Sequence, residues 1–316
     1  MQIALTGSSS YLAGVLLPLL ENDPDIQEII GLDLKPRTDS FKKLHWLKRD
    51  VRDPEIYKDM QGCDALVHLA FIVMPLRKES LALEINIEGS KNAFLAGAKA
   101  GVKKIVHASS CAAYGAWPDN PELISEDHPL RGMPDFYYSF SKAKVEEYLD
   151  RFEQEHPHIV VTRLRPPIFL GPTINNLMRE IAARKIFVNI SNRQIKAQFA
   201  WDEDIASAFH LALKKDFPGA FNVAGDGCLN AQEMADILNL WTVPLPYSLA
   251  LLGTKILWHL RISKNLSPGW LKVLTYPIII NTDKARKIMG WVPKHDTRAA
   301  LVRFAKEIKK ADSCKA

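Results

Sequence analysis

The hydrophobic positions in the first half of the chain follow two alternating spacings. Short apolar runs rich in β-branched residues are typical of buried strands, whereas apolar residues three or four positions apart indicate helices. Strand patterns occupy 2–6, 28–33, 65–71, 104–110 and 160–167, and helical patterns occupy 11–22, 85–101 and 137–156. Strands that alternate with helices build βαβ units. The pattern therefore predicts an α/β fold with a doubly wound parallel sheet.

The second half of the chain is less regular. Residues 199–215 indicate a strand end and an amphipathic helix, and 219–225 indicate another short strand, so we expect segments near 197–226 to rejoin the sheet. We predict a nucleotide-binding domain over 1–171. Residues 172–316 should mainly form a smaller substrate-binding domain over the carboxyl ends of the strands, where ligands of such folds bind.

Composition favours an ordinary globular protein, because 47% of the 316 residues are hydrophobic and 24% are charged. Cys63, Cys111, Cys228 and Cys314 are widely separated and form no CxxC pair. They predict neither a disulfide framework nor a zinc site, and no other metal site is expected. No export signal follows Met1, so the cytoplasm is the simplest setting.

Charge and hydropathy argue against two partner classes. The net charge is +5, but basic and acidic residues are interspersed, which disfavours nucleic-acid binding. The longest apolar stretch, 243–260, contains two prolines, a lysine and a histidine, so no transmembrane span is expected. Peripheral contact with a membrane surface stays open.

The segment ALTGSSSYLAG (4–14) lies between the first strand and the first helix. A tight turn there would aim the amides of the helix N-terminus at a pyrophosphate. Asp33 ends the second strand, 26 positions after Gly7, near the spacing at which a carboxylate binds the adenosine ribose hydroxyls. It would also repel a 2'-phosphate. The alternative is a serine-rich helix cap without a ligand.

A second candidate for chemistry is YSFSK, in which Tyr138 and Lys142 are four residues apart and share one helix face. A phenol has a pKa near 10, and a nearby cation favours its anion. The pair therefore suits a general base. The alternative is a surface aromatic residue and a solvated lysine, because this spacing is common in helices.

The order of these motifs resembles the extended short-chain dehydrogenases, the NAD-dependent epimerase/dehydratase family. The first turn is similar to the TGxxGxxG motif, with Ser10 and Ala13 where glycines are usual. The later segments that match are Asp50-Val51, HLA (68–70), SSxxxYG (109–115), YxxxK and LRPPIFLGP (164–172). The resemblance covers essentially the whole chain, including DEDIA, FNVAG and DKARKIMGWVPK.

The resemblance implies a Rossmann fold, bound NAD or NADP, and an enzyme that transfers a hydride. Of the two cofactors NAD is expected, because Asp33 would repel the 2'-phosphate of NADP. It assigns Ser110 to orient the substrate oxygen, Tyr138 to act as the acid or base, and Lys142 to support it. Ser109 is expected to be mainly structural, and His68 to be a satisfied strand histidine. The expected cofactor-binding set is Thr6, Gly7, Ser9, Ser10, Tyr11, Leu12, Asp33, Asp50, Val51, Leu69, Ala70, Phe71, Asn86, Ser109, Tyr138, Lys142, Pro166 and Ile168.

The family includes nucleotide-sugar epimerases and dehydratases as well as hydroxysteroid dehydrogenases. Dehydratases resemble one another in an acidic pair after the catalytic Ser or Thr; Cys111 and Ala112 stand there, so dehydration is not expected. A sugar diphosphate is usually bound by arginine forks. Ala197 occupies the first such position, beside Lys196, and residues 274–287 lack the second arginine stretch.

We therefore expect a small-molecule substrate that is a lipophilic secondary alcohol or ketone. A nucleotide-sugar epimerase is the alternative, because Lys196, Arg193 and Arg184 could bind a diphosphate from other positions. A non-catalytic nucleotide sensor is disfavoured, because it need not keep the proton relay.

An apolar region in the second half resembles the hydrophobic C-terminal parts of hydroxysteroid dehydrogenases. Its residues are Leu245, Leu249, Leu251, Leu252, Ile256, Leu257, Trp258, Trp270 and Leu271. They could wall an apolar pocket, rest on a membrane or simply pack the smaller domain.

A homodimer is expected by resemblance, because the helices near 87–100 and 138–154 are similar to those that form a four-helix interface in the family. Ala93, Phe94, Val145 and Tyr148 are the candidate interface residues, although they could equally face their own sheet.

Overall fold

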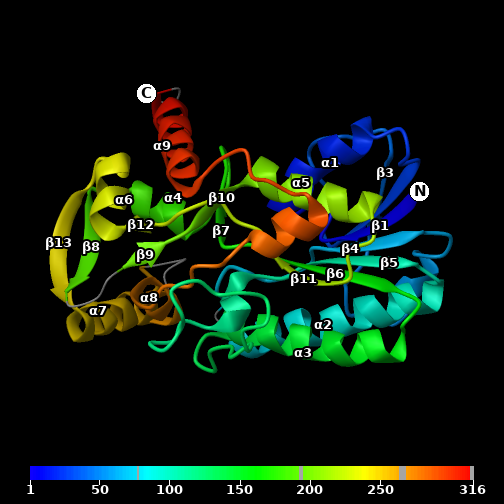
Figure 1. The fold of residues 1–316 in the computed structure, drawn as a ribbon, viewed down its shortest axis with the longest axis horizontal. Helices are drawn as coiled ribbons and strands as arrows, with labels where there is room; N and C mark the ends of the chain where they lie inside the picture. Colours follow the sequence, from blue (N-terminus) through cyan, green and yellow to red (C-terminus); the bar gives the residue numbers. More distant parts are fainter. Residues whose placement is uncertain (77, 192–194, 263–267, 314–316) are drawn as a thin grey trace.

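The computed structural model describes residues 1–76, 78–191, 195–262 and 268–313. A seven-stranded sheet runs through its larger lobe in the order β11-β6-β5-β4-β1-β2-β3, with every neighbouring pair parallel (Figure 1). The strands are β1 (Gln2–Thr6), β2 (Glu28–Asp33), β3 (Leu44–Lys48), β4 (Ala65–His68), β5 (Lys104–Ala108), β6 (Val160–Arg165) and β11 (Gly219–Asn222). The predicted doubly wound α/β sheet is confirmed.

Two helix pairs cover the sheet, one pair on each face. Helices α1 (Tyr11–Asn22) and α5 (Asp202–Lys214) pack together on one face, and α2 (Glu79–Ala100) and α3 (Tyr137–Glu155) pack on the other (Figure 1). Each pair buries an apolar cluster against the strands. Burial on both faces explains why the central strands are nearly continuous apolar runs in sequence.

A smaller lobe lies beyond the carboxyl ends of the strands. It contains the paired strands β7 (Ile168–Leu170) with β10 (Phe199–Trp201), β9 (Lys196–Ala197) with β12 (Leu229–Asn230), and β8 (Ile186–Ser191) with β13 (Trp241–Pro246). Its helices are α4 (Leu177–Ala182), α6 (Ala231–Leu238), α7 (Tyr247–His259), α8 (Pro268–Thr275) and α9 (Thr297–Ser313). Single helical turns are η1 (Ile56–Lys58), η2 (Cys111–Tyr114) and η3 (Ala285–Met289).

Several local predictions need correction. The edge strand β3 was missed, because its residues are mostly exposed or half-buried and its sequence is basic. Helix α2 begins at Glu79, six residues before the apolar pattern that predicted it. Strand β11 and helix α5 join the larger lobe, whereas β10 pairs with β7 outside the central sheet. The division of the chain at residue 171 remains a prediction.

The proposed dimer helices use most of their apolar residues within the chain. Ala93, Phe94 and Val145 are fully buried in the core under α2 and α3, and Tyr148 is half-buried against it. These residues therefore give no support to a dimer interface, and the dimer remains a prediction.

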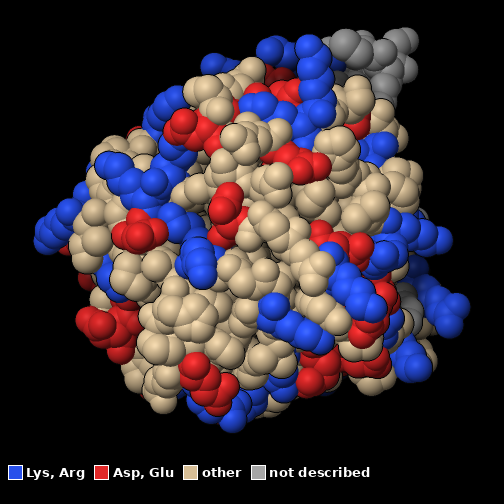
Figure 2. All heavy atoms as spheres, turned by 90° about the vertical axis from the view of Figure 1, so that its right-hand side faces the viewer, with Lys and Arg blue, Asp and Glu red and all other residues tan. Residues whose placement is uncertain are grey.

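Figure 2 shows the end of the molecule formed by the larger lobe, where cationic and anionic side chains are interspersed.

Within the described ranges, no helix combines the length and the apolar character needed to cross a bilayer.

Candidate active site

The turn between β1 and α1 requires glycine at position 7. Gly7 has a φ of 70°, and an added Cβ would lie 2.6 Å from the backbone nitrogen of Ala70. Ser10 replaces the second usual glycine with a φ of −68°, and its hydroxyl caps α1 by accepting a hydrogen bond from the Ala13 amide at 3.3 Å. The close turn is thus preserved without a second glycine, and it leads directly into the helix N-terminus.

Asp33 lies beside this turn, at the carboxyl end of β2. Its carboxylate accepts hydrogen bonds from the amides of Ser9 at 3.0 Å and Leu34 at 2.7 Å. Arg37 donates to the carbonyl oxygens of Ser8 and Ser10 and pairs with Asp39. The carboxylate therefore has a fixed position with spare acceptor capacity, while the nearby guanidinium is already engaged.

A cavity of about 320 Å³ opens at this edge of the sheet. It is lined by predicted cofactor residues Thr6, Gly7, Ser9, Ser10, Asp33, Asp50, Val51, Leu69, Ala70 and Phe71. The sequence reasoning missed further lining residues, namely Leu32, Leu34, Lys35, Arg49, Ile56, Ile72 and Ile85. A turn, a carboxylate and apolar walls in one cavity fit the adenosine half of a dinucleotide.

Eight predicted cofactor residues do not line this cavity: five of them lie around Ser110 and Tyr138, and the other three are Tyr11, Leu12 and Asn86. The Tyr11 hydroxyl donates to Asp202, and Leu12 is buried in the core. Asn86 is fully buried, and its amide bonds both the amide and the carbonyl of Ile72, at 2.7 and 3.1 Å. Asn86 thus positions a lining residue, and a direct role of any of the three in cofactor binding remains a prediction.

Ser110, Tyr138 and Lys142 come together where β5 ends against the first turns of α3. The Ser110 side chain reaches Tyr138 and lowers its pKa, but burial has the larger effect and raises the pKa to about 12. Burial also lowers the pKa of Lys142 to about 7, although Glu146 opposes this. From the sequence we expected Lys142 to lower the pKa of Tyr138. In the structure burial has the largest effect on the pKa of both residues.

The Lys142 ammonium lies closer to Phe71 than to the tyrosine. It donates to the Ala108 carbonyl, sits 3.4 Å from the Phe71 ring centroid, and lies 5.9 Å from the Tyr138 ring centroid. Phe71 also touches Tyr138 edge-on at 5.7 Å between centroids. Phe71 therefore stands between the adenosine-type cavity and the Tyr138–Lys142 pair.

The remaining predicted residues lie around Ser110. The Pro166 carbonyl accepts hydrogen bonds from the Cys111 amide at 2.9 Å and the Ser110 hydroxyl at 3.4 Å. Ile168 follows in β7 and packs in the same apolar cluster as Tyr138. Ser109 instead donates to Glu146, consistent with its expected structural part.

Glu146 is the centre of a buried ionic network that sequence reasoning missed. Its carboxylate is paired with Arg165 at 2.7 Å and with Arg163 at 3.1 Å, and these cations hold its pKa at about 2 despite burial. The available signal was spacing, because Tyr138, Lys142 and Glu146 repeat every four residues on α3.

His68 is fully buried, as expected of a strand histidine. Its ring nitrogens contact Thr6 at 2.7 Å and Ser90 at 2.9 Å, and its ring stacks on His107 of the next strand. Burial lowers the pKa of His68 to about 3 and that of His107 well below the ordinary value. Among the described residues no cluster of three potential ligands could hold a metal ion.

Tyr138 lies against an aromatic wall from the smaller lobe. Trp270 of α8 stacks on its ring at 6.1 Å between centroids, and Phe136 contacts both rings. Gly269 allows this approach, because a Cβ there would lie 2.5 Å from the Phe136 ring. The surroundings of Tyr138 are therefore largely apolar on the side of the smaller lobe.

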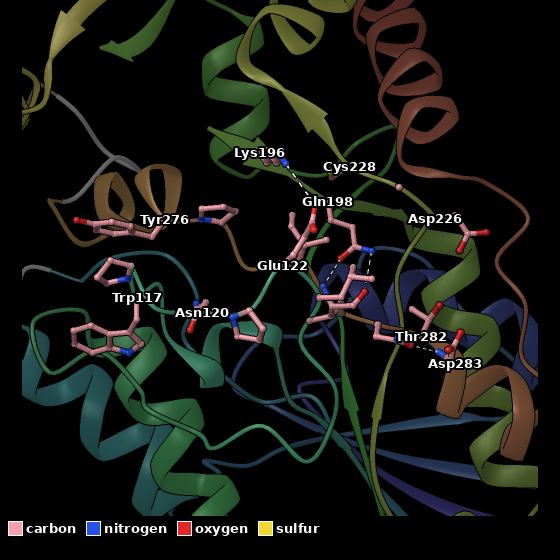
Figure 3. Close-up of a pocket in the computed structure, with 18 of the residues that line it drawn as sticks. Trp117, Asn120, Glu122, Lys196, Gln198, Asp226, Cys228, Tyr276, Thr282 and Asp283 are labelled. Atoms are coloured by element: carbon pink, nitrogen blue, oxygen red, sulfur yellow. Dashed lines mark hydrogen bonds and ion pairs between the residues drawn. The ribbon is translucent and has the colours of Figure 1, made fainter. Parts of the chain in front are cut away.

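A larger cavity of about 990 Å³ was not predicted and contains none of the expected site residues (Figure 3). It is lined by parts of 117–123, 196–198, 226–228 and 275–283. Lys196 lines it and lies 3.9 Å from Glu122. Arg184 pairs with Glu180 on α4, and Arg193 lies outside the described residues.

Comparison with known families accounts for this arrangement. Residues 3–224 match the model of the NAD dependent epimerase/dehydratase family. The chain belongs to that family. The match spans the nucleotide turn, Ser110, Tyr138 and Lys142, so the chain is an enzyme of the short-chain dehydrogenase type, and its family is NAD-dependent.

Known relatives differ in function. The chain is 26% identical over 311 residues to an uncharacterized protein of Mycobacterium tuberculosis, covering 95% of this chain and 82% of the relative. It is 30% identical over 219 residues to an N-acetyl-α-D-glucosaminyl-diphospho-ditrans,octacis-undecaprenol 4-epimerase of Escherichia coli O157:H7, covering 65% and 64%. A vaccinia virus 3β-hydroxysteroid dehydrogenase/Δ5→4-isomerase is 25% identical over 152 residues, covering 46% and 44%.

Solved structures show the same fold. MoeE5 in complex with UDP-glucuronic acid and NAD superposes with a TM-score of 0.77 at 16% identity, covering 98% of this chain and all of that one.

Proposed function

We propose that this family member is an NAD-dependent oxidoreductase whose substrate is a lipophilic secondary alcohol or ketone. The observation that carries the proposal is the aromatic wall of Trp270 and Phe136 against Tyr138. Phe136 is 1% and Trp270 is 8% exposed, so an apolar substrate would have to take the place of part of this packing; its own apolar surface buried there would contribute about 25 cal/mol per Å². A charged sugar diphosphate gains nothing from such a wall.

The residues around the expected reaction centre support definite roles. In the oxidation direction Tyr138 takes the proton of the substrate hydroxyl, and Ser110 donates a hydrogen bond to the same oxygen. Bound NAD would accept the hydride from the carbinol carbon. Lys142 favours the Tyr138 anion only when its own amine is protonated. Glu146 raises the pKa of Lys142 and so increases the protonated fraction.

NAD preference is also part of the proposal. Asp33 is held by two backbone amides, so it cannot swing away from a 2'-phosphate without losing both. Arg37, one of the cations that could neutralise that phosphate, is engaged by Ser8, Ser10 and Asp39. Lys35 and Arg49 line the cavity beside Asp33.

Replacing Asp33 by Ala should weaken NAD binding by about tenfold or more, because hydrogen bonds to charged groups contribute about 1.5–3 kcal/mol. It should weaken NADP binding less. Calorimetric titration with NAD and with NADP measures the ratio of the two dissociation constants. A ratio equal to that of the native protein would show that Asp33 does not select the cofactor.

Tyr138→Phe tests the catalytic assignment. The variant should lose at least about a hundredfold in turnover, the usual contribution of acid–base catalysis, while NADH binding stays within about twofold. Tyr148→Phe is the matched control, because Tyr148 lies on the same helix and away from Ser110. Both variants are compared in a screen of hydrophobic alcohols by NADH absorbance. Equal turnover in both variants would exclude Tyr138 as the acid or base.

Sugar epimerisation is the second candidate, favoured by the likeness to the bacterial 4-epimerase of a lipid-linked sugar. The name of that relative describes a substrate in which a sugar is joined through a diphosphate to undecaprenol, a long apolar chain. The two functions separate by product: dehydrogenation accumulates NADH, whereas epimerisation returns the hydride and accumulates none. Conversion of UDP- or GDP-sugars without NADH release, together with no activity on hydrophobic alcohols, would make epimerisation the first candidate and dehydrogenation the second.

A further inference from the structure

One end of the smaller lobe exposes an apolar helix face. Leu249, Leu252, Ile256 and Leu260 recur every three or four residues along α7 and just past its end, so they form one stripe. Between 48% and 61% of each side chain is exposed. The opposite face of α7 packs inward through Ala250 and Thr254. The stripe therefore faces solvent rather than the protein core.

The two-stranded sheet beside α7 continues this surface. Trp241 of β13 is paired with Ile186 of β8, and Val243 with Val188, so the four side chains share one face. All four are more than 40% exposed, and Trp241 reaches 79%. The strands and α7 lie together at one end of the molecule (Figure 1). We call these eight residues the apolar end, and exposed apolar side chains gathered at one end of a molecule indicate an interaction site.

Along α7 and the segments that flank it, the charges have one sign. Residues 237–282 contain no Asp or Glu, although these make up 36 of the 316 residues and about five would be expected in such a stretch. Lys255 and His259 each follow a stripe residue by three positions and flank the stripe, and Arg261 comes next. Lys255 and Arg261 are exposed, and neither pairs with an acidic residue in the described ranges. The larger lobe contrasts with this, because both signs mix on its outer end (Figure 2).

We propose that the apolar end docks on the surface of a lipid bilayer that contains anionic headgroups. An amphipathic helix with apolar side chains on one face and cations at its edge lies in the headgroup region and inserts only that face. The absence of acidic residues removes the repulsion that such headgroups would otherwise produce. A second copy of the chain fits less well, because a symmetric contact through this surface would bring the same cations together.

One helix, α8, lies between the helix of the docking surface and Tyr138. Helix α7 packs on α8, whose Trp270 stacks on Tyr138 at 6.1 Å. A lipid-dissolved substrate would thus meet the protein next to the aromatic wall. The docking proposal does not depend on the substrate, because vesicle binding is measured without substrate or cofactor.

The test is flotation of the full chain with vesicles. About three parts phosphatidylcholine to one part phosphatidylglycerol should bind the protein at least about tenfold more strongly than phosphatidylcholine alone at low salt, and added salt should reduce the difference. The double variant Leu252→Glu with Ile256→Glu should reduce binding to the anionic vesicles at least about tenfold, because it removes two inserting side chains.

A matched control uses Ile288→Glu with Val292→Glu. These side chains are 56% and 58% exposed on the other lobe and give the same change in net charge. Control binding should stay within about threefold of the native protein, the effect of a general loss of positive charge. An equal loss in both double variants, or no binding of the native protein, would overturn the proposal.

A second measurement locates the contact. Brominated lipids should quench the fluorescence of the native protein, and Trp241→Phe should remove part of that quenching without loss of binding beyond about threefold. If light scattering shows a dimer that Leu252→Glu dissociates, and quenching is absent, the surface binds a second copy instead.

Discussion

Replacing Glu146 by Gln should destabilise the protein more than any other single charge removal on α3. The side chain is fully buried, and both of its carboxylate oxygens accept hydrogen bonds. Arg165 is itself 4% exposed and pairs with no other carboxylate in the described part of the chain. The variant would leave a buried guanidinium facing an uncharged amide that also presents N–H donors to it.

The expected magnitude follows from what Arg165 retains. After the change it keeps the Tyr114 hydroxyl at 2.8 Å and the Glu126 carbonyl at 3.2 Å, but no negative charge. Removing one partner of a buried ion pair lowers the free energy of unfolding by about 3–5 kcal/mol. Because Arg165 keeps two hydrogen bonds, we expect a loss near the lower limit, about 3 kcal/mol. Asp150→Asn is the matched control, because Asp150 is 63% exposed and should contribute less than about 1 kcal/mol.

Urea unfolding followed by circular dichroism measures both variants at pH 7.5, where Glu146 is ionised. A double variant, Glu146→Gln with Arg165→Met, should recover part of the loss, because no unpaired charge then remains. Equal losses for Glu146→Gln and Asp150→Asn would refute the account. So would a double variant that is no more stable than Glu146→Gln alone.

Two further predictions concern the core of the larger lobe. Gly7→Ala should lower the free energy of unfolding by about 1–3 kcal/mol and abolish NADH binding, because the added Cβ would collide with Ala70. Gly101→Ala is the matched control: Gly101 has a comparable φ of 87°, and an added Cβ there would have nothing within 4 Å. It should lower the free energy of unfolding by only about 1 kcal/mol. Similar NADH affinity in the two variants would contradict this. Stability should fall as the pH drops below 6.5, because the unfolded chain protonates His68 and His107 there while the folded pKa of His68 is about 3. For His68 the loss approaches about 1.4 kcal/mol per pH unit down to about pH 3. His107 adds a loss of the same sign, which His107→Leu should remove; an unchanged slope in that variant would show that His107 is not buried as a neutral ring.

The sequence predicted the sheet and placed Tyr138 and Lys142 on one helix face, because both features depend on local patterns. Buried parallel strands are continuous apolar runs, and Tyr138 and Lys142 share a helix face through their spacing alone. Strand β3 escaped detection because an edge strand exposes charged side chains and lacks that pattern. Asn86 was placed by resemblance, which identifies a position but not whether its amide meets a ligand or the Ile72 backbone.

Other features could not be predicted because they depend on contacts between distant segments. The ionic network joins α3 to β6, and the aromatic wall brings Trp270 onto a tyrosine more than a hundred residues earlier in the chain. The pKa of Tyr138 also shifts in the direction opposite to the one expected from the sequence. Adjacent charge alone predicted a lower pKa for Tyr138, but desolvation, which only the three-dimensional packing determines, raises it.

These shifts bear on how the candidate site could work. Burial favours the neutral forms of both Tyr138 and Lys142, so in the chain alone neither group is prepared for proton transfer near neutral pH. Among the residues that the structure describes, Glu146 is the one carboxylate that raises the pKa of Lys142, and its charge is shared with two arginines. Its support for the Lys142 ammonium is therefore partial, and a further favourable contact is needed at Lys142. Phe71 supplies only a ring face there, over which the ammonium sits at 3.4 Å. Hydroxyl groups that accept hydrogen bonds from Lys142 in place of that ring would raise its pKa and bring its charge to bear on Tyr138. The ribose of a bound dinucleotide carries such hydroxyls, so cofactor binding and activation of the tyrosine would be one event rather than two.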